Sequence, residues 1–154
     1  MKFLQHGAAL LWLLATLSLA PIATLAAQES PLQVSIPILV YHRFGPTVAD
    51  SMTVRTETFV AQLKYLRDNG FTVVPLRQAV DALAGKGTAL PGKPVVITVD
   101  DGHRTVFSEL LPLIQREKIP VTLFIYPSAI SNADYAMTWQ QLAQLRDTGL
   151  FDIQ

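Results

Sequence analysis

Hydrophobic residues occur along this chain in two alternating patterns. Short runs rich in β-branched and aromatic residues lie at 36–41, 71–74, 95–99 and 121–125, and a similar run begins at residue 150. Between them, apolar residues recur every three or four positions, which is typical of helices with one buried face. Strands that alternate with helices predict a parallel sheet joined by crossover helices, so we expect an α/β fold with about five strands.

The boundaries of the helices are marked by local signals. A helix that starts near Thr56 should end at Asn69-Gly70, and a short helix should follow Pro75. A third helix is expected over 104–117, with a bend at Pro112. The sequence from Thr138 to Gln141 predicts a capping box at the start of a fourth helix.

The N-terminus has the pattern of a targeting segment. Lys2 precedes an apolar stretch that ends in the small residues Ala26 and Ala27, which predicts a secretory signal peptide over residues 1–27 and export to the periplasm or the medium. An uncleaved membrane anchor is the alternative, but the strongly apolar core is shorter than the ~20 residues a span needs. We therefore expect no stable membrane span after cleavage, a linker at 28–35 and a domain portion at 36–154.

Charge and cysteine content exclude several classes of protein. The 154 residues carry twelve basic and twelve acidic side chains and no cysteine. Loss of residues 1–27 would remove only Lys2 from this balance, so no basic field remains to attract nucleic acid. Without cysteine there is no disulfide and no thiolate nucleophile. The sequence does not indicate an oligomeric state.

The candidate chemistry lies at the end of the third apolar run. Residues 94–102 read P-V-V-I-T-V-D-D-G, so Asp100 and Asp101 follow a buried strand directly. Active sites of α/β folds gather at the carboxyl ends of parallel strands. Two adjacent carboxylates are stable together when they share a proton or bind a cation, and a divalent metal would satisfy both. The simpler alternative is a surface turn that closes the strand.

These residues resemble a known family. T-V-D-D-G at 98–102 is similar to the T-F-D-D-G motif of polysaccharide deacetylases, the NodB homology domain of carbohydrate esterase family 4, with Val99 in place of the usual Phe. The stretches 36–44, 57–71, 119–125 and 137–142 resemble other segments of that domain in the same order. The resemblance implies a partial (β/α) barrel of the NodB type, truncated after about five strands.

The resemblance also implies roles for individual residues. Asp100 corresponds to the general base, and Asp101 to a ligand of a divalent metal, with zinc as the first candidate. His42 corresponds to a residue that lines the groove for the substrate, an N-acetylated polysaccharide whose acetyl groups are removed. His103 is expected to face solvent or to cap the next helix. The particular polymer stays open.

The family pattern is incomplete in this sequence. Its other metal ligands come from a His-(Ser or Thr)-x-x-His motif that should follow a strand such as the one at 150–154, and this motif is absent. We therefore expect a fragment that binds metal poorly and is inactive alone. Two alternatives remain: a non-catalytic carbohydrate-binding or assembly protein with the same fold, and a glycoside hydrolase that uses Asp100 as acid or base.

Overall fold

The computed structural model of the chain describes residues 35–154. The predicted signal peptide at 1–27, and all of the predicted linker except Ser35, lie outside the described residues. Within residues 35–154, no helix is long and apolar enough to cross a membrane.

The core of the fold is a parallel sheet, as the alternation of strands and helices predicted. The strand order is β1 (Ile38–Tyr41), β5 (Pro94–Val99), β6 (Val121–Leu123) and β7 (Phe151–Ile153), and β4 (Thr72–Val73) pairs with the first residues of β5. Every pairing in this sheet is parallel. The α/β class and the expected strands are therefore confirmed, although four of the five are shorter than the apolar runs that indicated them.

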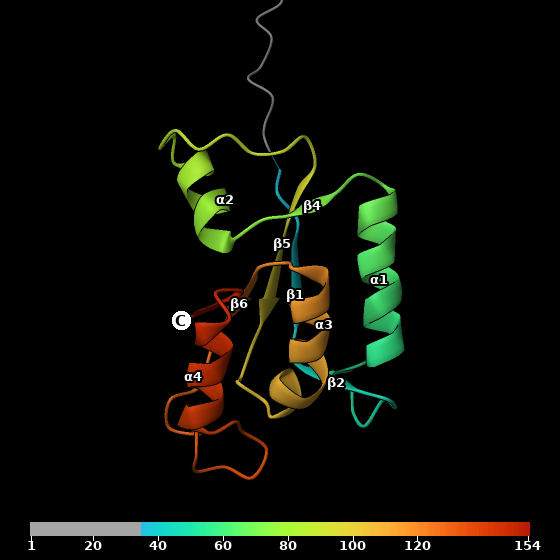
Figure 1. Ribbon diagram of the computed structural model, residues 1–154, viewed down its shortest axis with the longest axis vertical. Coiled ribbons are helices and arrows are strands. Elements are labelled where there is room, and N and C mark those ends of the chain that lie inside the picture. The colour runs from blue at the N-terminus through green and yellow to red at the C-terminus, as the bar shows by residue number, and fades with distance from the viewer. Residues whose placement is uncertain (1–34) are drawn as a thin grey trace, which may run out of the picture. The chain divides into compact units, whose positions relative to one another are not determined.

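Helices cover one face of this sheet. Three helices pack on it: α1 (Thr56–Asp68), α3 (Leu111–Glu117) and α4 (Trp139–Asp147) (Figure 1). Their buried side chains meet Val95, Ile97 and Val99 of β5 in one apolar cluster. The remaining helix, α2 (Leu76–Leu83), packs through Ala79 against Val96, which points to the other face.

Beyond α2, that second face of the sheet is exposed only in part, since Thr98 and Thr122 on it are buried. Ile38 and Val40 of β1 are about half exposed, and Phe124, just after β6, is 40% exposed. In the parallel register, side chains of paired residues lie on the same face. The positions that follow β1 and β5 on this face are His42 and Asp100, so the candidate site lies at the end of this face.

The ends of the helices follow the sequence signals closely. Gly70 and Gly149, which follow α1 and α4, both have a left-handed backbone, with φ of 75° and 70°. The capping box at Thr138 is present in full: its hydroxyl accepts the Gln141 N–H, and the Gln141 side chain accepts the Thr138 N–H.

Two local features differ from the sequence-based expectation. The expected helix over 104–117 contains a five-residue π-helical segment, η1 (Val106–Leu110), before α3 begins. Pro112 lacks an N–H group and its ring crowds the preceding turn, so the wider π turn takes the place of a simple bend. The short parallel pair β2 (Arg43–Gly45) and β3 (Thr53–Arg55) was not predicted.

Candidate active site

Asp100 and His42 meet at the carboxyl ends of two neighbouring strands. The register pairs Tyr41 with Val99, and the Asp100 N–H donates to the Tyr41 carbonyl at 2.9 Å. The next residues, His42 and Asp100, therefore lie side by side, with Nε2 of His42 3.9 Å from Oδ2 of Asp100. This separation suits an ion pair but is too long for a hydrogen bond. Both side chains are partly exposed, so each can also reach a bound molecule.

Asp101 leaves the strand through a left-handed backbone conformation. Its φ is 72°, and Gly102 follows with φ of 71°. If the strand continued, Asp101 would point with Val99 into the helix-covered core. The turn prevents this, and Asp101 stays partly exposed. A left-handed non-glycine residue costs about 1–2 kcal/mol, which the fold tolerates at this position.

Gly102 is required at this turn by packing as well as by φ. A Cβ atom at this position would lie 2.9 Å from Cδ1 of Ile130 and 3.3 Å from Cγ2 of Ile125. The Gly102 carbonyl also accepts the Met137 N–H at 3.0 Å. The turn that carries Asp101 is therefore packed against the 125–137 segment.

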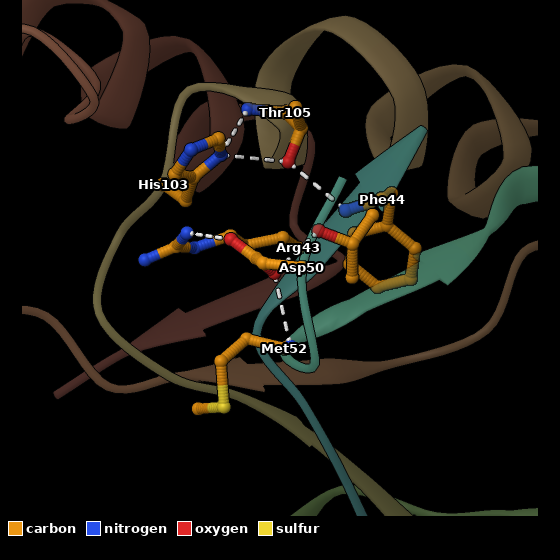
Figure 2. A network of polar contacts seen from close by, with 7 residues as sticks. Arg43, Phe44, Asp50, Met52, His103 and Thr105 are labelled. Carbon is orange, nitrogen blue, oxygen red and sulfur yellow. Dashed lines mark hydrogen bonds and ion pairs between the residues drawn. The ribbon is translucent and has the colours of Figure 1, made fainter. Parts of the chain in front are cut away.

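His103 caps the start of the next helical segment, one of the two roles expected from the sequence. Its Nδ1 lies 3.2 Å from the Thr105 N–H nitrogen, which donates to it, and 2.9 Å from the Thr105 hydroxyl. The same hydroxyl oxygen accepts the Phe44 N–H at 3.0 Å. Because Nδ1 accepts, the ring carries its proton on Nε2. Figure 2 shows how these contacts join His103 and Thr105 to Phe44 of β2.

The pKa of His103 is lowered from its ordinary value. Burial is the main cause, and the positive charges of Arg43 and Arg104 lower the pKa further. The negative charges of Asp50 and Asp101 act in the opposite direction but do not prevail. The ring of Tyr135 stacks on the imidazole with ring centres 6.1 Å apart. The lowered pKa favours the neutral form of His103.

Asp50 organises the loop between β2 and β3. Its carboxylate forms an ion pair with Arg43 and accepts hydrogen bonds from the Thr53 hydroxyl at 2.8 Å and the Met52 N–H at 3.0 Å. The hydrogen bond from Thr53 is the main cause that lowers the pKa of Asp50. These contacts fix the loop beside the His103 cap (Figure 2).

The described residues do not by themselves form a complete metal site. Carboxylate oxygens such as those of Asp101 suit a divalent ion, but a catalytic zinc has three protein ligands. Among residues 35–154, no group of three or more His, Asp or Glu side chains is placed to hold a metal. These oxygen donors are of the type that binds a divalent ion, but they are fewer than the three ligands that a catalytic zinc needs.

The structure adds residues that the sequence did not single out. Arg43 begins β2, Asp50 lies in the β2–β3 loop, and Thr105 begins the helical segment after the D-D-G turn. Their spacing in the sequence carries no motif, since the contacts join segments about sixty residues apart. The resemblance had assigned His42 and the two aspartates, and the structure brings His42 and Asp100 together.

Comparisons with known proteins agree with the motif. Residues 87–154 match the family model described as polysaccharide deacetylase. The chain is 28% identical over 129 residues to the poly-β-1,6-N-acetyl-D-glucosamine N-deacetylase of Escherichia coli, covering 73% of this chain and 19% of that protein. It thus spans a minor part of this curated relative. The resemblance to polysaccharide deacetylases is confirmed.

Solved structures support the same conclusion for the fold. The structure of IcaB from Ammonifex degensii shares 28% identity with a TM-score of 0.67, covering 77% of this chain and 52% of that chain. The de-N-acetylase from Aggregatibacter actinomycetemcomitans shares 25% identity with a TM-score of 0.66, covering 77% and 53%. The predicted partial barrel of the NodB type is therefore confirmed, and the chain spans about half of each of these structures.

Proposed function

We propose that this chain carries part of the active site of a metal-dependent deacetylase that acts on an N-acetylated polysaccharide. The proposal rests on one observation: the D-D-G motif lies at the carboxyl end of a central parallel strand, with His42 3.9 Å from Asp100. The curated relative named above acts on poly-β-1,6-N-acetyl-D-glucosamine, which makes this polymer the first substrate to examine.

In this proposal, each residue has a distinct task in the hydrolysis of the acetamide bond. Asp100 is the general base, and it accepts a proton from the attacking water. Asp101 is a ligand of the divalent ion, with zinc as the first choice; such an ion, when bound, acidifies water and polarises a carbonyl. His42 contacts the substrate from the neighbouring strand, where its partial exposure leaves the ring accessible.

The number of ligands suggests a limit on the activity of this chain. Residues 35–154 place one proposed ligand, Asp101, where three are needed. We therefore expect weak metal affinity and no turnover from these residues alone. The proposal also includes export, with residues 1–27 as signal peptide, 28–35 as linker and 36–154 as the deacetylase portion.

The incomplete ligand set favours one alternative. A carbohydrate-binding or assembly protein retains the fold and needs no metal. Metal binding distinguishes the two hypotheses. The deacetylase hypothesis requires that Asp101 contribute to zinc affinity, and the carbohydrate-binding hypothesis does not. The alternative also predicts that Asp100 takes no part in catalysis, even within a complete deacetylase domain.

The first test is a titration of the 154-residue chain with zinc. We expect weak binding that Asp101→Asn reduces and that Asp134→Asn, a change in the loop before α4, leaves unaltered. Equal zinc affinity in the parent chain and in Asp101→Asn would contradict the metal assignment.

The second test measures acetate release in a chimera. Residues 36–154 replace the matching segment of the E. coli enzyme, and the substrate is poly-β-1,6-N-acetyl-D-glucosamine. We expect release that Asp100→Asn reduces by at least about a hundredfold, the usual lower range for a general base, whereas Asp134→Asn retains it. A folded chimera that keeps its activity with Asp100→Asn would refute the assignment of the base.

A further inference from the structure

Two hydrogen bonds join the same pair of segments, one on each side of His42. The Asp100 N–H donates to the Tyr41 carbonyl at 2.9 Å, just before His42 in the chain. The Phe44 N–H donates to the Thr105 hydroxyl at 3.0 Å, just after it. The first hydrogen bond continues the pairing of β1 with β5, whereas the second is a separate link from β2 to the start of the next helical segment. The segment that carries His42 is therefore tied to the D-D-G turn at both of its ends.

The Phe44 N–H depends on Thr105 for its acceptor. The neighbouring Arg43 N–H donates to the Met52 carbonyl at 3.2 Å, on the side of β3. The Phe44 N–H donates to Thr105 instead, and Phe44 itself is buried. A buried N–H group that loses its acceptor also lacks the compensation of water, so its loss is costly. The Thr105 hydroxyl thus fixes the course of the chain two residues beyond His42.

The Thr105 hydroxyl is in turn directed by His103. Its oxygen accepts the Phe44 N–H, and a hydroxyl has one hydrogen of its own to donate. That hydrogen is available to Nδ1 of His103, 2.9 Å away, which also accepts the Thr105 N–H. The contacts form a chain of donors and acceptors with one direction, from Phe44 through Thr105 to His103 (Figure 2). A valine at position 105 would interrupt it on both sides.

Both ends of this chain of contacts are packed. The His103 imidazole stacks on the Tyr135 ring with ring centres 6.1 Å apart, and the Arg104 N–H donates to the Tyr135 carbonyl at 2.8 Å. At the other end, the Phe44 ring packs on Phe59 with ring centres 5.2 Å apart. A link between two packed ends can hold the residues between them at a defined separation.

We propose that Thr105 and His103 are positioning residues for the proposed reaction, and that their hydrogen bonds hold His42 at its distance of 3.9 Å from Asp100. They act through the main chain of residues 42–44. A displacement of about 1 Å in an active site can lower a rate by about a hundredfold, so a link two residues from His42 is close enough to affect catalysis. The inference rests on the proposed function and adds two residues to it that touch neither the base nor the proposed metal ligand through a hydrogen bond.

Hydrogen exchange tests the link without any catalysis. In the 154-residue chain, Thr105→Val keeps the shape of the side chain and removes the hydroxyl. We expect the Phe44 amide to exchange about tenfold faster, as the loss of one hydrogen bond implies, and Thr105→Ser to retain slow exchange. Thr138→Ala, which removes the capping box of α4, is the matched control and shows how much of the change comes from lower overall stability. Unchanged exchange of Phe44 in folded Thr105→Val would overturn the proposal.

Acetate release by the chimera described above tests the consequence for catalysis. We expect Thr105→Val to lower kcat by about ten- to a hundredfold and Thr105→Ser to restore most of it. A residue that only stabilises the fold would leave kcat of the folded enzyme unchanged, which is the result expected for Thr138→Ala. His103→Asn should lose less than His103→Ala, because an asparagine oxygen can accept the N–H two residues further on.

Thermal unfolding shows that each variant is folded before its kcat is measured. If Thr105→Val does not fold, Thr105→Ala replaces it, since the smaller side chain leaves room for a water at the Phe44 N–H. A kcat in the folded variant equal to that of the parent chimera would overturn the positioning role.

The Asp100→Asn chimera separates this inference from the proposed function. If Asp100→Asn abolishes acetate release and Thr105→Val does not reduce it, the positioning role is wrong and the deacetylase assignment stands. If Asp100→Asn leaves acetate release unchanged, the proposed function fails, and the positioning role fails with it. Loss of kcat in both variants, with recovery in Thr105→Ser, supports both.

Discussion

Replacement of Gly102 by alanine tests whether the D-D-G turn is held by packing. Two costs should add. A left-handed backbone costs an alanine about 1–2 kcal/mol, and the new Cβ, 2.9 Å from Cδ1 of the buried Ile130, overpacks a dense region at about 1–3 kcal/mol. We expect the free energy of unfolding to fall by about 2–5 kcal/mol in urea denaturation.

The chain provides a matched control for the backbone cost. Gly87 has φ of 83°, and a Cβ added there would meet nothing within 4 Å. Gly87→Ala should therefore lower the free energy of unfolding only by the backbone cost, about 1–2 kcal/mol. The difference between the two alanine variants isolates the packing contribution at Gly102.

A double mutant identifies the atom responsible. Ile130→Val removes the Cδ1 atom that the new Cβ would approach. In combination with Gly102→Ala, it should recover part of the loss, which appears as a favourable coupling energy between the two sites. The reasoning is refuted if Gly102→Ala costs no more than Gly87→Ala, or if the two substitutions are additive.

Three further predictions concern the surroundings of the site, all measured by urea denaturation. The folded-state pKa of Asp50 is lowered below its unfolded value of 3.8. The contribution of its carboxylate to the free energy of unfolding is therefore complete above pH 3.8 and is lost as the pH falls through the folded pKa. Asp50→Asn should remove this acid-dependent loss of stability. Thr105→Val leaves the Phe44 N–H without its acceptor, and should cost about 1–3 kcal/mol. Thr138→Ala removes the capping box and should cost about 1 kcal/mol.

Each of these predictions has its own control. Asp134→Asn should retain the acid dependence that Asp50→Asn abolishes. Thr88→Val, in an exposed loop, should change the stability by less than about 0.5 kcal/mol, and an equal loss at both threonines would contradict the role of Thr105. Thr138→Ser keeps a hydroxyl and should restore most of the cap. A loss as large as that of Thr138→Ala would count against the capping contact.

The sequence predicted the elements whose signals are local and repeated. Apolar runs located the strands of the main sheet, and Asn69-Gly70 marked the end of α1 because a left-handed stop depends on one residue type. The capping box at Thr138 is also local. These features depend on neighbours within four positions, which a sequence shows directly.

Features that depend on distant partners were not predictable in this way. The β2–β3 pair comprises three residues on each side, too few for periodicity, and it closes around Asp50. The π segment before Pro112 depends on how the helix continues after the proline, which the local sequence does not show. The left-handed φ of Asp101 belongs to a turn whose Gly102 packs against Ile125 and Ile130, which lie far along the chain.

The hydrogen bonds of His103 affect its ability to act as a metal ligand. An imidazole that coordinates an ion through Nε2 must carry its hydrogen on Nδ1, and here Nδ1 already accepts from the Thr105 N–H and lies 2.9 Å from its hydroxyl. Coordination would forfeit these contacts and release the helix cap. His103 is therefore poorly suited to act as a metal ligand, although it lies only two positions from Asp101, the ligand in the proposed function.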